Sequence, residues 1–513
     1  MSLDFRTLCS IAISTVLLGA AAHSMASCKV FDPSLVDEGG DDGDGDDDDG
    51  GAECTEPVDE LCNERDDDCD SAVDEDFDLD TDEENCGACG RTCTFAHASG
   101  ECAAGACANT CADGWKDCNE EDLDGCEANL ENKSSCGDCG LTCPFACSAS
   151  ACVTGAGVAA GRTWTCLTMS SGGVRCWGSN NMGQLGSGDT APSSVPRDVT
   201  ALDDATQLAV GFGHSCALRD GGVAACWGQN DRGQVGDGTT AQRTAPVPVV
   251  LGNVDDIAVG LAHTCARSGA RIHCWGFNDA GQLGQGDEVH RPLPTLIPAK
   301  VSGDIVDLAA GLAHTCAVRT TGEVICMGFN DQGQAGVPPM SEGGLLHVLD
   351  PVVVPGFDDA VQISLGHAHS CALTGTGGVR CWGWNGFGQL GDGTFLSRSA
   401  PSDVVDDTGV TLSGIERVVA GPNRTCALNG KGEAFCWGDN TEGALGAGSG
   451  ALQHPRALRV QIEDVPTILD VAVGEKHTCF LGGLGIRCVG ENQEGQLGDG
   501  STITSRTGVD VAL

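Results

Sequence analysis

The sequence predicts an all-β protein: a seven-bladed β-propeller, preceded by a disulfide-rich, loop-dominated segment and a disordered acidic linker. One unit of about 50 residues recurs seven times in residues 155–513, and each copy holds about four short β-runs between glycine-rich turns. Helical periodicity is absent from these copies, and 32 of the 513 residues are cysteine. The predicted parts are a signal peptide (1–28), an acidic linker (29–53), a Cys-rich double repeat (54–153) and the propeller (154–513).

The charge excludes two classes of partner. The chain carries 27 lysines and arginines against 74 aspartates and glutamates, a net charge of −47, most of it in residues 29–154. Binding to nucleic acid needs clustered basic residues that release phosphate counterions, so we expect no nucleic-acid partner. Electrostatic docking on anionic lipid is disfavoured for the same reason, which leaves a lipid anchor as the only expected membrane attachment.

The N-terminus predicts export. The apolar run from Leu8 to Ala22 is too short for a transmembrane helix and is followed by small residues, as in a signal peptide. The residues Met25-Ala26-Ser27-Cys28 resemble a bacterial lipobox, although Met25 stands where leucine is usual. The resemblance implies lipidation of Cys28; the alternative is ordinary cleavage after Ala26. We expect either an outer-membrane lipoprotein of the cell envelope or an extracellular protein.

The acidic linker has no means of folding. Residues 37–50 consist only of Asp, Glu and Gly, so they repel one another and bury no apolar surface. We expect a hydrophilic spacer, with calcium scavenging as the alternative.

The next segment contains two copies of one eight-cysteine pattern, and each copy includes CGxCGxxC and ends in CxxxxC. The copies are Cys54, Cys62, Cys69, Cys86, Cys89, Cys93, Cys102, Cys107 and Cys111, Cys118, Cys126, Cys136, Cys139, Cys143, Cys147, Cys152. Zinc could explain the CxxC pairs, but eight cysteines in a small exported unit favour four disulfides. Their connectivity stays open among 105 arrangements.

Four carboxylates in the first copy form a candidate calcium site. Asp66, Asp68 and Asp70 alternate, and Asp74 follows, a spacing that lets a tight loop turn several oxygens onto one hard cation. The stretch resembles an acidic metal-binding repeat of exported bacterial proteins, and the resemblance implies these four residues as ligands. The alternative is a solvated acidic loop. The second copy retains only Asp122, Asp124 and Glu127, so we expect weaker binding or none there.

Cysteine spacing in the large repeat predicts one disulfide within each blade. Two cysteines face each other across a hairpin when both lie equally far from the turn centre. The pair 216/226 then flanks the three-residue loop Asp220–Gly222, and the shorter pair 265/274 flanks the two-residue loop Gly269–Ala270. Directly opposed cysteines are within bridging range. The predicted bonds are Cys166–Cys176, Cys216–Cys226, Cys265–Cys274, Cys316–Cys326, Cys371–Cys381, Cys426–Cys436 and Cys479–Cys488.

The repeat resembles a known family. The motif G-x-x-H-[ST]-C-A-L, then G-x-V-x-C-W-G-x-N, then G-Q-L-G-x-G is similar to the regulator-of-chromosome-condensation repeat and covers nearly all of residues 155–513. The resemblance implies a seven-bladed propeller. The family includes eukaryotic nucleotide-exchange factors, chromatin binders and exported bacterial propellers, among them inhibitors of β-lactamases. The paired blade cysteines depart from the nuclear members. Val509–Val511 aligns with Val247–Val250 and is expected to complete or clasp the ring against the strand near Val158.

The recurring polar and aromatic residues are predicted to be structural. One histidine per blade would lie too far from the next to share an ion, so we expect hydrogen bonds to backbone at a turn for His214, His263, His314, His369 and His477. The tryptophans after the second blade cysteine should pack between blades, and the asparagines before the GQLG runs should organise turns.

The sequence therefore predicts a non-enzymatic binding scaffold. No GxSxG, HExxH or P-loop occurs, and the sialidase nucleophile, a tyrosine, is absent because the chain has no Tyr. We expect the loops to recognise a protein or a glycan, with the insertions Val337–Leu349 and Ser402–Gly414 as candidate contacts. The alternatives are guanine-nucleotide exchange, as in eukaryotic family members, inhibition of an extracellular enzyme, and an unrecognised hydrolase.

Overall fold

The computed structural model describes residues 78–118, 126, 128–129, 135, 146–148, 151–298, 304–463 and 465–513. The predicted signal peptide, Cys28, the acidic linker and the four predicted calcium ligands Asp66, Asp68, Asp70 and Asp74 lie outside these residues. A search of the described residues finds no helix with the length and apolar character needed to cross a membrane.

The described residues of the Cys-rich segment include three small antiparallel pairs of strands. They are β1 (Ala98–Ala103) with β2 (Ala106–Cys111), β3 (Trp115–Lys116) with β4 (Ala128–Asn129), and β5 (Ala146–Ser148) with β6 (Ala151–Val153). Disulfides join Cys86 to Cys102, Cys93 to Cys107 and Cys111 to Cys126. The cysteines thus take the place of a larger apolar core, as expected for a segment of this size.

The propeller consists of seven four-stranded antiparallel sheets, each built from consecutive strands. Blade 1 consists of β7 (Gly155–Ala160), β8 (Trp164–Met169), β9 (Val174–Gly178) and β10 (Ser193–Asp198), and blade 2 of β11 (Ala205–Val210), β12 (His214–Arg219), β13 (Val223–Gly228) and β14 (Arg243–Pro248). Blade 3 consists of β15 (Asp256–Val259), β16 (His263–Ser268), β17 (Arg271–Gly276) and β18 (Arg291–Leu296), and blade 4 of β19 (Ile305–Ala310), β20 (His314–Arg319), β21 (Val324–Phe329) and β22 (His347–Val353). Blade 5 consists of β23 (Ala360–Leu365), β24 (His369–Thr374), β25 (Val379–Gly383) and β26 (Arg398–Asp403), and blade 6 of β27 (Ile415–Ala420), β28 (Arg424–Asn429), β29 (Ala434–Asp439) and β30 (Gln453–Arg459). Blade 7 consists of β31 (Ile468–Val473), β32 (His477–Gly482), β33 (Gly485–Gly490) and β34 (Ser505–Asp510). The helical turns among the described residues are the short 3₁₀ segments η1 (Met340–Glu342) and η2 (Thr441–Gly443).

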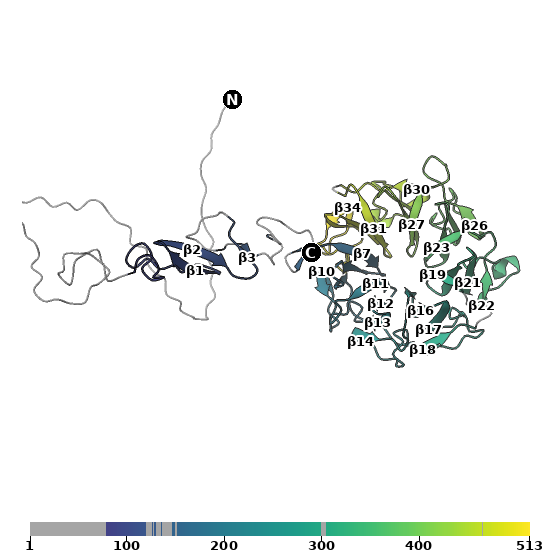
Figure 1. The fold of residues 1–513 in the computed structure, drawn as a ribbon. Helices are drawn as coiled ribbons and strands as arrows, with labels where there is room; N and C mark the ends of the chain where they lie inside the picture. Colours follow the sequence, from purple (N-terminus) through teal and green to yellow (C-terminus); the bar gives the residue numbers. More distant parts are fainter. Residues whose placement is uncertain are drawn as a thin grey trace, which may run out of the picture. The chain divides into compact units, whose positions relative to one another are not determined.

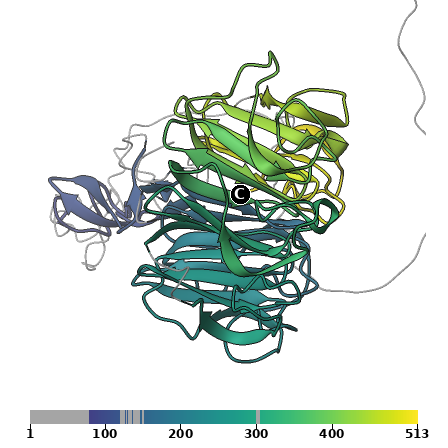
Figure 2. The same ribbon diagram turned by 90° about the vertical axis from the view of Figure 1, so that its right-hand side faces the viewer.

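The blades are arranged radially around a central axis. Figure 1 looks along this axis and shows the first strand of each blade, such as β7, β19 and β31, nearest the centre, while last strands such as β14, β22 and β30 lie at the rim. In Figure 2, turned by 90°, the strands run across the thickness of the ring. The predicted seven-bladed fold is therefore confirmed.

The second and third strands of each blade form the predicted hairpin. Cys216 lies directly opposite Cys226, and the connecting loop is Asp220–Gly222, where Gly221 and Gly222 have φ of 78° and 76°. A side chain would strain both positions, which explains the glycines. A disulfide joins the two opposed cysteines in all seven blades, at the pairs expected from the spacing, with Cα–Cα distances of 4.0–4.1 Å.

The hydrophobic core lies between neighbouring sheets. One cluster combines Cys166, Cys176 and Leu185 of blade 1 with Ala217 and Trp227 of blade 2, and all five are fully buried. Comparable clusters join the other blades. Each blade is therefore stabilised mainly by the blades beside it.

The ring closes without exchange of strands. The C-terminal β34 pairs with β33 of its own blade, where Val509 lies opposite Cys488 as Val247 lies opposite Cys226. It completes blade 7, as the alignment with Val247 predicted, and it does not pair with β7. Blades 7 and 1 instead meet through side-chain packing, since Val158 and Val511 share one apolar cluster.

Candidate functional site

The recurring histidines join one blade to the next. The Nε2 atoms of His214, His263, His314, His369 and His477 lie 2.8–3.1 Å from a Thr or Ser hydroxyl of the following blade. Each hydroxyl donates its own proton to a main-chain carbonyl of the preceding blade, for example Thr264 to the Gln234 oxygen at 2.8 Å. The hydroxyl must therefore accept from the imidazole N–H. The prediction of a structural role is right, but the partner is a side chain of the next blade and not the backbone of a turn.

Burial keeps these imidazoles neutral. It lowers the pKa of His314 to about 3 and that of His263 to about 4, because no compensating charge faces either ring. Their Nδ1 atoms are buried without a hydrogen-bond partner. The Nε2 atoms of the five rings thus take part in contacts between blades.

The tryptophans and asparagines also have structural contacts. Trp177, Trp227, Trp275, Trp382 and Trp437 donate their indole N–H to a glutamine carbonyl of the preceding blade, at 2.8–3.0 Å. The asparagine of each turn accepts the main-chain N–H five residues later, as Asn180 does from Leu185 at 2.9 Å. Both predictions of packing and turn roles are confirmed.

Blade 6 replaces the histidine with a fully buried arginine. The guanidinium of Arg424 donates to the main-chain oxygen of Asp439 at 2.9 Å and to that of Glu475 in blade 7 at 2.9 Å. The Nη2 atom that donates to Glu475 also lies 3.4 Å from the Asp439 carboxylate. One carboxylate and several carbonyls thus satisfy a charge that would otherwise be costly to bury.

A ring of glycines narrows one end of the central channel. In six blades the glycine three residues before the histidine position lines it: Gly161, Gly211, Gly260, Gly311, Gly366 and Gly421. A Cβ at Gly311 would lie 2.5 Å from both the Gly366 carbonyl oxygen of the next blade and the His314 ring. Glycine is needed here because the seven inner strands converge, which the sequence alone did not reveal.

Charged and aromatic side chains lie together over this end. Arg162 of blade 1 pairs with Glu475 of blade 7 at 2.5 Å and lies 5.0 Å from the ring centroid of Phe212. The Phe212 ring in turn lies 5.1 Å from that of His367 in blade 5. Arg162, Phe212, His367 and the six glycines line a cavity of about 90 Å³, which is too small for a drug-sized ligand.

Polar side chains of the inner strands fasten neighbouring blades along the channel. Asp307 accepts the Ile363 N–H at 2.6 Å, Asp470 accepts the Val158 N–H at 3.0 Å, and Gln207 donates to Asp256 at 2.8 Å. Burial raises the pKa of Asp307 to about 7; the hydrogen bond from Ile363 opposes that shift and the nearby Asp256 adds to it. These carboxylates serve as inter-blade contacts, and no pattern in the sequence predicts this role.

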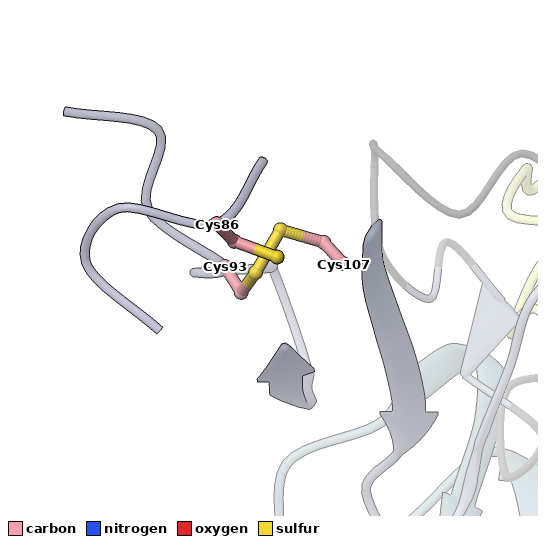
Figure 3. Close-up of side chains that lie close together, drawn as sticks. All are labelled: Cys86, Cys93 and Cys107. Atoms are coloured by element: carbon pink, nitrogen blue, oxygen red, sulfur yellow. A yellow bond between two sulfur atoms is a disulfide. The ribbon is translucent and has the colours of Figure 1, made fainter. Parts of the chain in front are cut away.

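Three cysteines of the stapled segment approach one another as metal ligands would. The sulfur atoms of Cys86, Cys93 and Cys107 lie within 4.8 Å of one another (Figure 3). However, Cys93 is bonded to Cys107, and Cys86 to Cys102. Oxidised sulfurs are not thiolate ligands, so this cluster is a pair of adjacent disulfides.

The two insertions predicted as contacts leave the ring at opposite faces. Val337–Leu349 connects the third and fourth strands of blade 4, whereas Ser402–Gly414 runs from the last strand of blade 5 to the first strand of blade 6. Strands alternate in direction within a blade, so these two kinds of connection emerge at opposite ends. A single binding surface on one face therefore cannot contain both insertions.

Comparison with known proteins identifies the family. The model of the regulator of chromosome condensation (RCC1) repeat matches residues 171–218, 226–267, 270–318, 321–373, 376–428 and 431–481, more than half of the chain. The chain therefore belongs to the RCC1 repeat family.

Individual relatives match parts of larger proteins or share the fold. The chain is 33% identical to human "Probable E3 ubiquitin-protein ligase HERC6" over 39% of its own length and 20% of that protein, and 28% identical to the Arabidopsis thaliana "Ultraviolet-B receptor UVR8" over 55% and 53%. It thus spans about half or less of these relatives. Among solved structures, yeast RCC1 (Prp20) bound to Kap60 has a TM-score of 0.58 at 22% identity, covering 66% of this chain and 83% of that one. Human WBSCR16 has a TM-score of 0.57 at 21% identity, covering 66% and 94%. At these identities the structural likeness shows the fold alone.

Proposed function

We propose that this propeller is an exported, non-enzymatic binding scaffold whose loops recognise a protein or glycan partner. The observation that carries the proposal is the buried disulfide in each of the seven blades. All fourteen blade cysteines have an exposed fraction of 0%. Disulfides of this number form and persist in oxidising compartments and not in a reducing cytosol. The matching interfaces between blades supply a rigid ring, and rigid rings present recognition loops well.

The test is the redox state and location of the native protein. Cells are fractionated in the presence of a thiol-alkylating reagent, and the intact mass is measured with and without reductant. The expected result is an envelope or extracellular protein whose blade cysteines alkylate only after reduction. Free alkylation of all fourteen blade thiols in a cytoplasmic protein would contradict export and would favour nucleotide exchange on a cytosolic GTPase.

We also propose that Cys28 carries a lipid anchor. The lipobox-like residues before it support this proposal, and the acidic linker would then act as a spacer. The expected mass of the mature protein includes acyl chains at Cys28, and the Cys28→Ala variant should be released into the soluble fraction. A wild-type protein cleaved after Ala26 and free of acyl chains would contradict the anchor.

Calcium binding at Asp66, Asp68, Asp70 and Asp74 is proposed from their alternation. Equilibrium dialysis of the full chain against radioactive calcium should show a site that Asp68→Asn with Asp70→Asn removes. The matched pair Asp122→Asn with Asp124→Asn, in the second copy, should leave that site intact. Equal loss in both variants would indicate diffuse attraction to acidic sequence and not a site.

A further inference from the structure

One position on the propeller distinguishes three consecutive blades from the rest. It is the residue after the glycine of the C-W-G motif or its equivalent: Ser179, Gln229, Phe277, Phe329, Trp384, Asp439 and Glu491. In every blade its main-chain N–H donates to the carbonyl of the residue that precedes the histidine position, at 2.7–3.0 Å. The seven residues are therefore structurally equivalent. They are aromatic in blades 3, 4 and 5 and polar in the other four blades.

Each of these aromatics is paired with a second ring in its own blade. The centroids of Phe277 and His290 are 5.1 Å apart, those of Phe329 and His347 are 5.8 Å apart, and those of Trp384 and Phe387 are 5.3 Å apart. All six side chains are half-buried, so part of each remains accessible. We call these six residues the aromatic sector. The other propeller tryptophans are fully buried, so Trp384 is an exception to the repeat.

Hydrogen bonds connect the loops that carry the aromatic sector from blade to blade, and exposed apolar side chains lie on the same loops. His347 of blade 4 is hydrogen-bonded to Glu288 of blade 3 at 2.7 Å, and Ser397 of blade 5 donates to Gln332 of blade 4 at 3.5 Å. Large apolar side chains stand exposed on the same three loops: Val289, Met340, Leu345, Phe395 and Leu396, with exposed fractions of 48–66%. Exposed apolar side chains grouped on neighbouring loops are typical of interaction sites.

The charge of these loops is of one sign. Loops 277–290, 329–347 and 384–397 contain no lysine or arginine. Among their carboxylates, Asp287 and Asp392 pair with arginines of the following strands. No lysine or arginine among the described residues forms an ion pair with the remaining carboxylates, Asp279, Glu288, Asp331 and Glu342. A cationic partner would find both accessible rings and unneutralised carboxylates here.

The edge of the sector already shows the expected geometry. The guanidinium of Arg232, from blade 2, lies 5.8 Å from the ring centroid of Phe277. This is within the range in which a cation is attracted to an aromatic face. Among the described residues, no arginine lies in this way over the rings of the aromatic sector in blades 4 and 5.

We propose that the aromatic sector binds a protein segment in which arginine or lysine alternates with apolar residues. The cations stack on Phe277, Phe329 and Trp384 and pair with the carboxylates, and the apolar residues contact Leu345 and Leu396. This inference rests on the proposed binding function and deepens it, because it assigns one face, three blades and a partner chemistry.

The test uses the full-length oxidised protein and a fluorescein-labelled decapeptide of alternating Arg and Leu. Anisotropy should show binding by the wild type, weaker binding of the Arg–Ser peptide and none of the Glu–Leu peptide. The variant with Phe277→Gln, Phe329→Gln and Trp384→Gln should bind the Arg–Leu peptide about tenfold or more weakly, because three cation–ring contacts are lost. Glutamine stands at this position in blade 2, so the fold is retained, and the net charge is unchanged. The matched control, Ser179→Ala with Gln229→Ala on the same face, should bind as the wild type does.

The outcomes separate this inference from the proposed function. Equal peptide binding by wild type and triple variant would mean attraction to acidic sequence elsewhere and would overturn the inference. If the wild type is a dimer and the triple variant a monomer, the occupant of the sector is a second copy of the chain. If only the triple variant loses binding of an oligosaccharide, the occupant is a glycan. Either result overturns the inference. If variants of Ser402–Gly414 lose partner binding while the triple variant does not, the binding function stands and the sector is wrong.

Discussion

At the scale of single residues, small size decides which side chain the narrow end of the ring tolerates. Gly311 has the His314 ring on one side and the carbonyl of Gly366 on the other, so its α-hydrogen fills the available space. Its counterparts in five other blades line the same end of the channel. Glycine is used here for close approach of backbones and not for a turn.

Gly311→Ala should therefore destabilise the protein, while Gly252→Ala should not. A Cβ at Gly311 overlaps main-chain and ring atoms, whereas none lies within 4 Å of a Cβ at Gly252. Overpacking of this kind costs about 1–3 kcal/mol. Urea unfolding of both variants measures the difference, and equal stability of the two would contradict the steric argument.

Asp307 should make stability depend on pH near neutrality. Its pKa is raised to about 7 by burial, so the folded state binds a proton that the unfolded state has already lost. The stabilisation is complete below the unfolded pKa near 4 and is lost as the pH rises through 7. Asp307→Asn, whose amide oxygen can still accept from Ile363, should raise the Tm at pH 8 and leave it nearly unchanged at pH 4.5. A Tm difference that is the same at both pH values would contradict this origin.

At the scale of elements, cysteine position alone does not determine pairing. In each blade, directly opposed cysteines bond to each other, as the hairpin arithmetic predicts. In the hairpin of β1 and β2, Cys102 and Cys107 are also directly opposed, yet they bond to Cys86 and Cys93. The second case has competing sulfurs nearby, which explains why the sequence could leave its connectivity only open.

Removing one blade disulfide should weaken the protein without unfolding it. Cys216→Ala with Cys226→Ala opens a loop of sequence separation 10, and loss of such a bond costs about 2–3 kcal/mol. The neighbouring blades still cover both faces of the sheet. Thermal unfolding under oxidising conditions should show a single, lowered transition. If the wild type and the double variant have equal Tm, the bond does not constrain the unfolded chain.

At the scale of the whole molecule, the sequence could predict the structure within each repeat but not the contacts between neighbouring repeats. Blade number, hairpin register and the packing role of Trp227 follow from spacing within one unit. The contact from His214 to Thr264 and the convergence of the glycines depend on how units meet, and no periodicity within a unit encodes that. The opposite placement of the two insertions could have been deduced from strand alternation. The aromatic sector is a difference of three blades from the other four, so the repeat pattern does not predict it.

The interface between blades 7 and 1 should be the first to open. His477 is bonded to Thr165 and Trp177 to the Gln496 carbonyl, the same pair of contacts as at the junctions of blades 2 and 3, 4 and 5, and 5 and 6, but no chain segment crosses it. Thr165→Val removes the acceptor for a buried imidazole N–H, a loss of about 1–3 kcal/mol. Hydrogen exchange should then accelerate in β7 and β31. The matched variant Thr264→Val, at a chain-linked interface, should not produce this local acceleration, and identical exchange patterns would refute a weak closing seam.

Because each blade is one uninterrupted stretch of chain and the seam uses the same bonds as several chain-linked junctions, the order of blades along the gene is separable from their order around the circle. A version in which the old ends are joined by a linker like the natural one between β14 and β15, and new ends are opened before β15, keeps every sheet whole. Circular permutation is thus open to this ring at any of its junctions, a freedom denied to propellers whose last sheet borrows a strand from the other terminus.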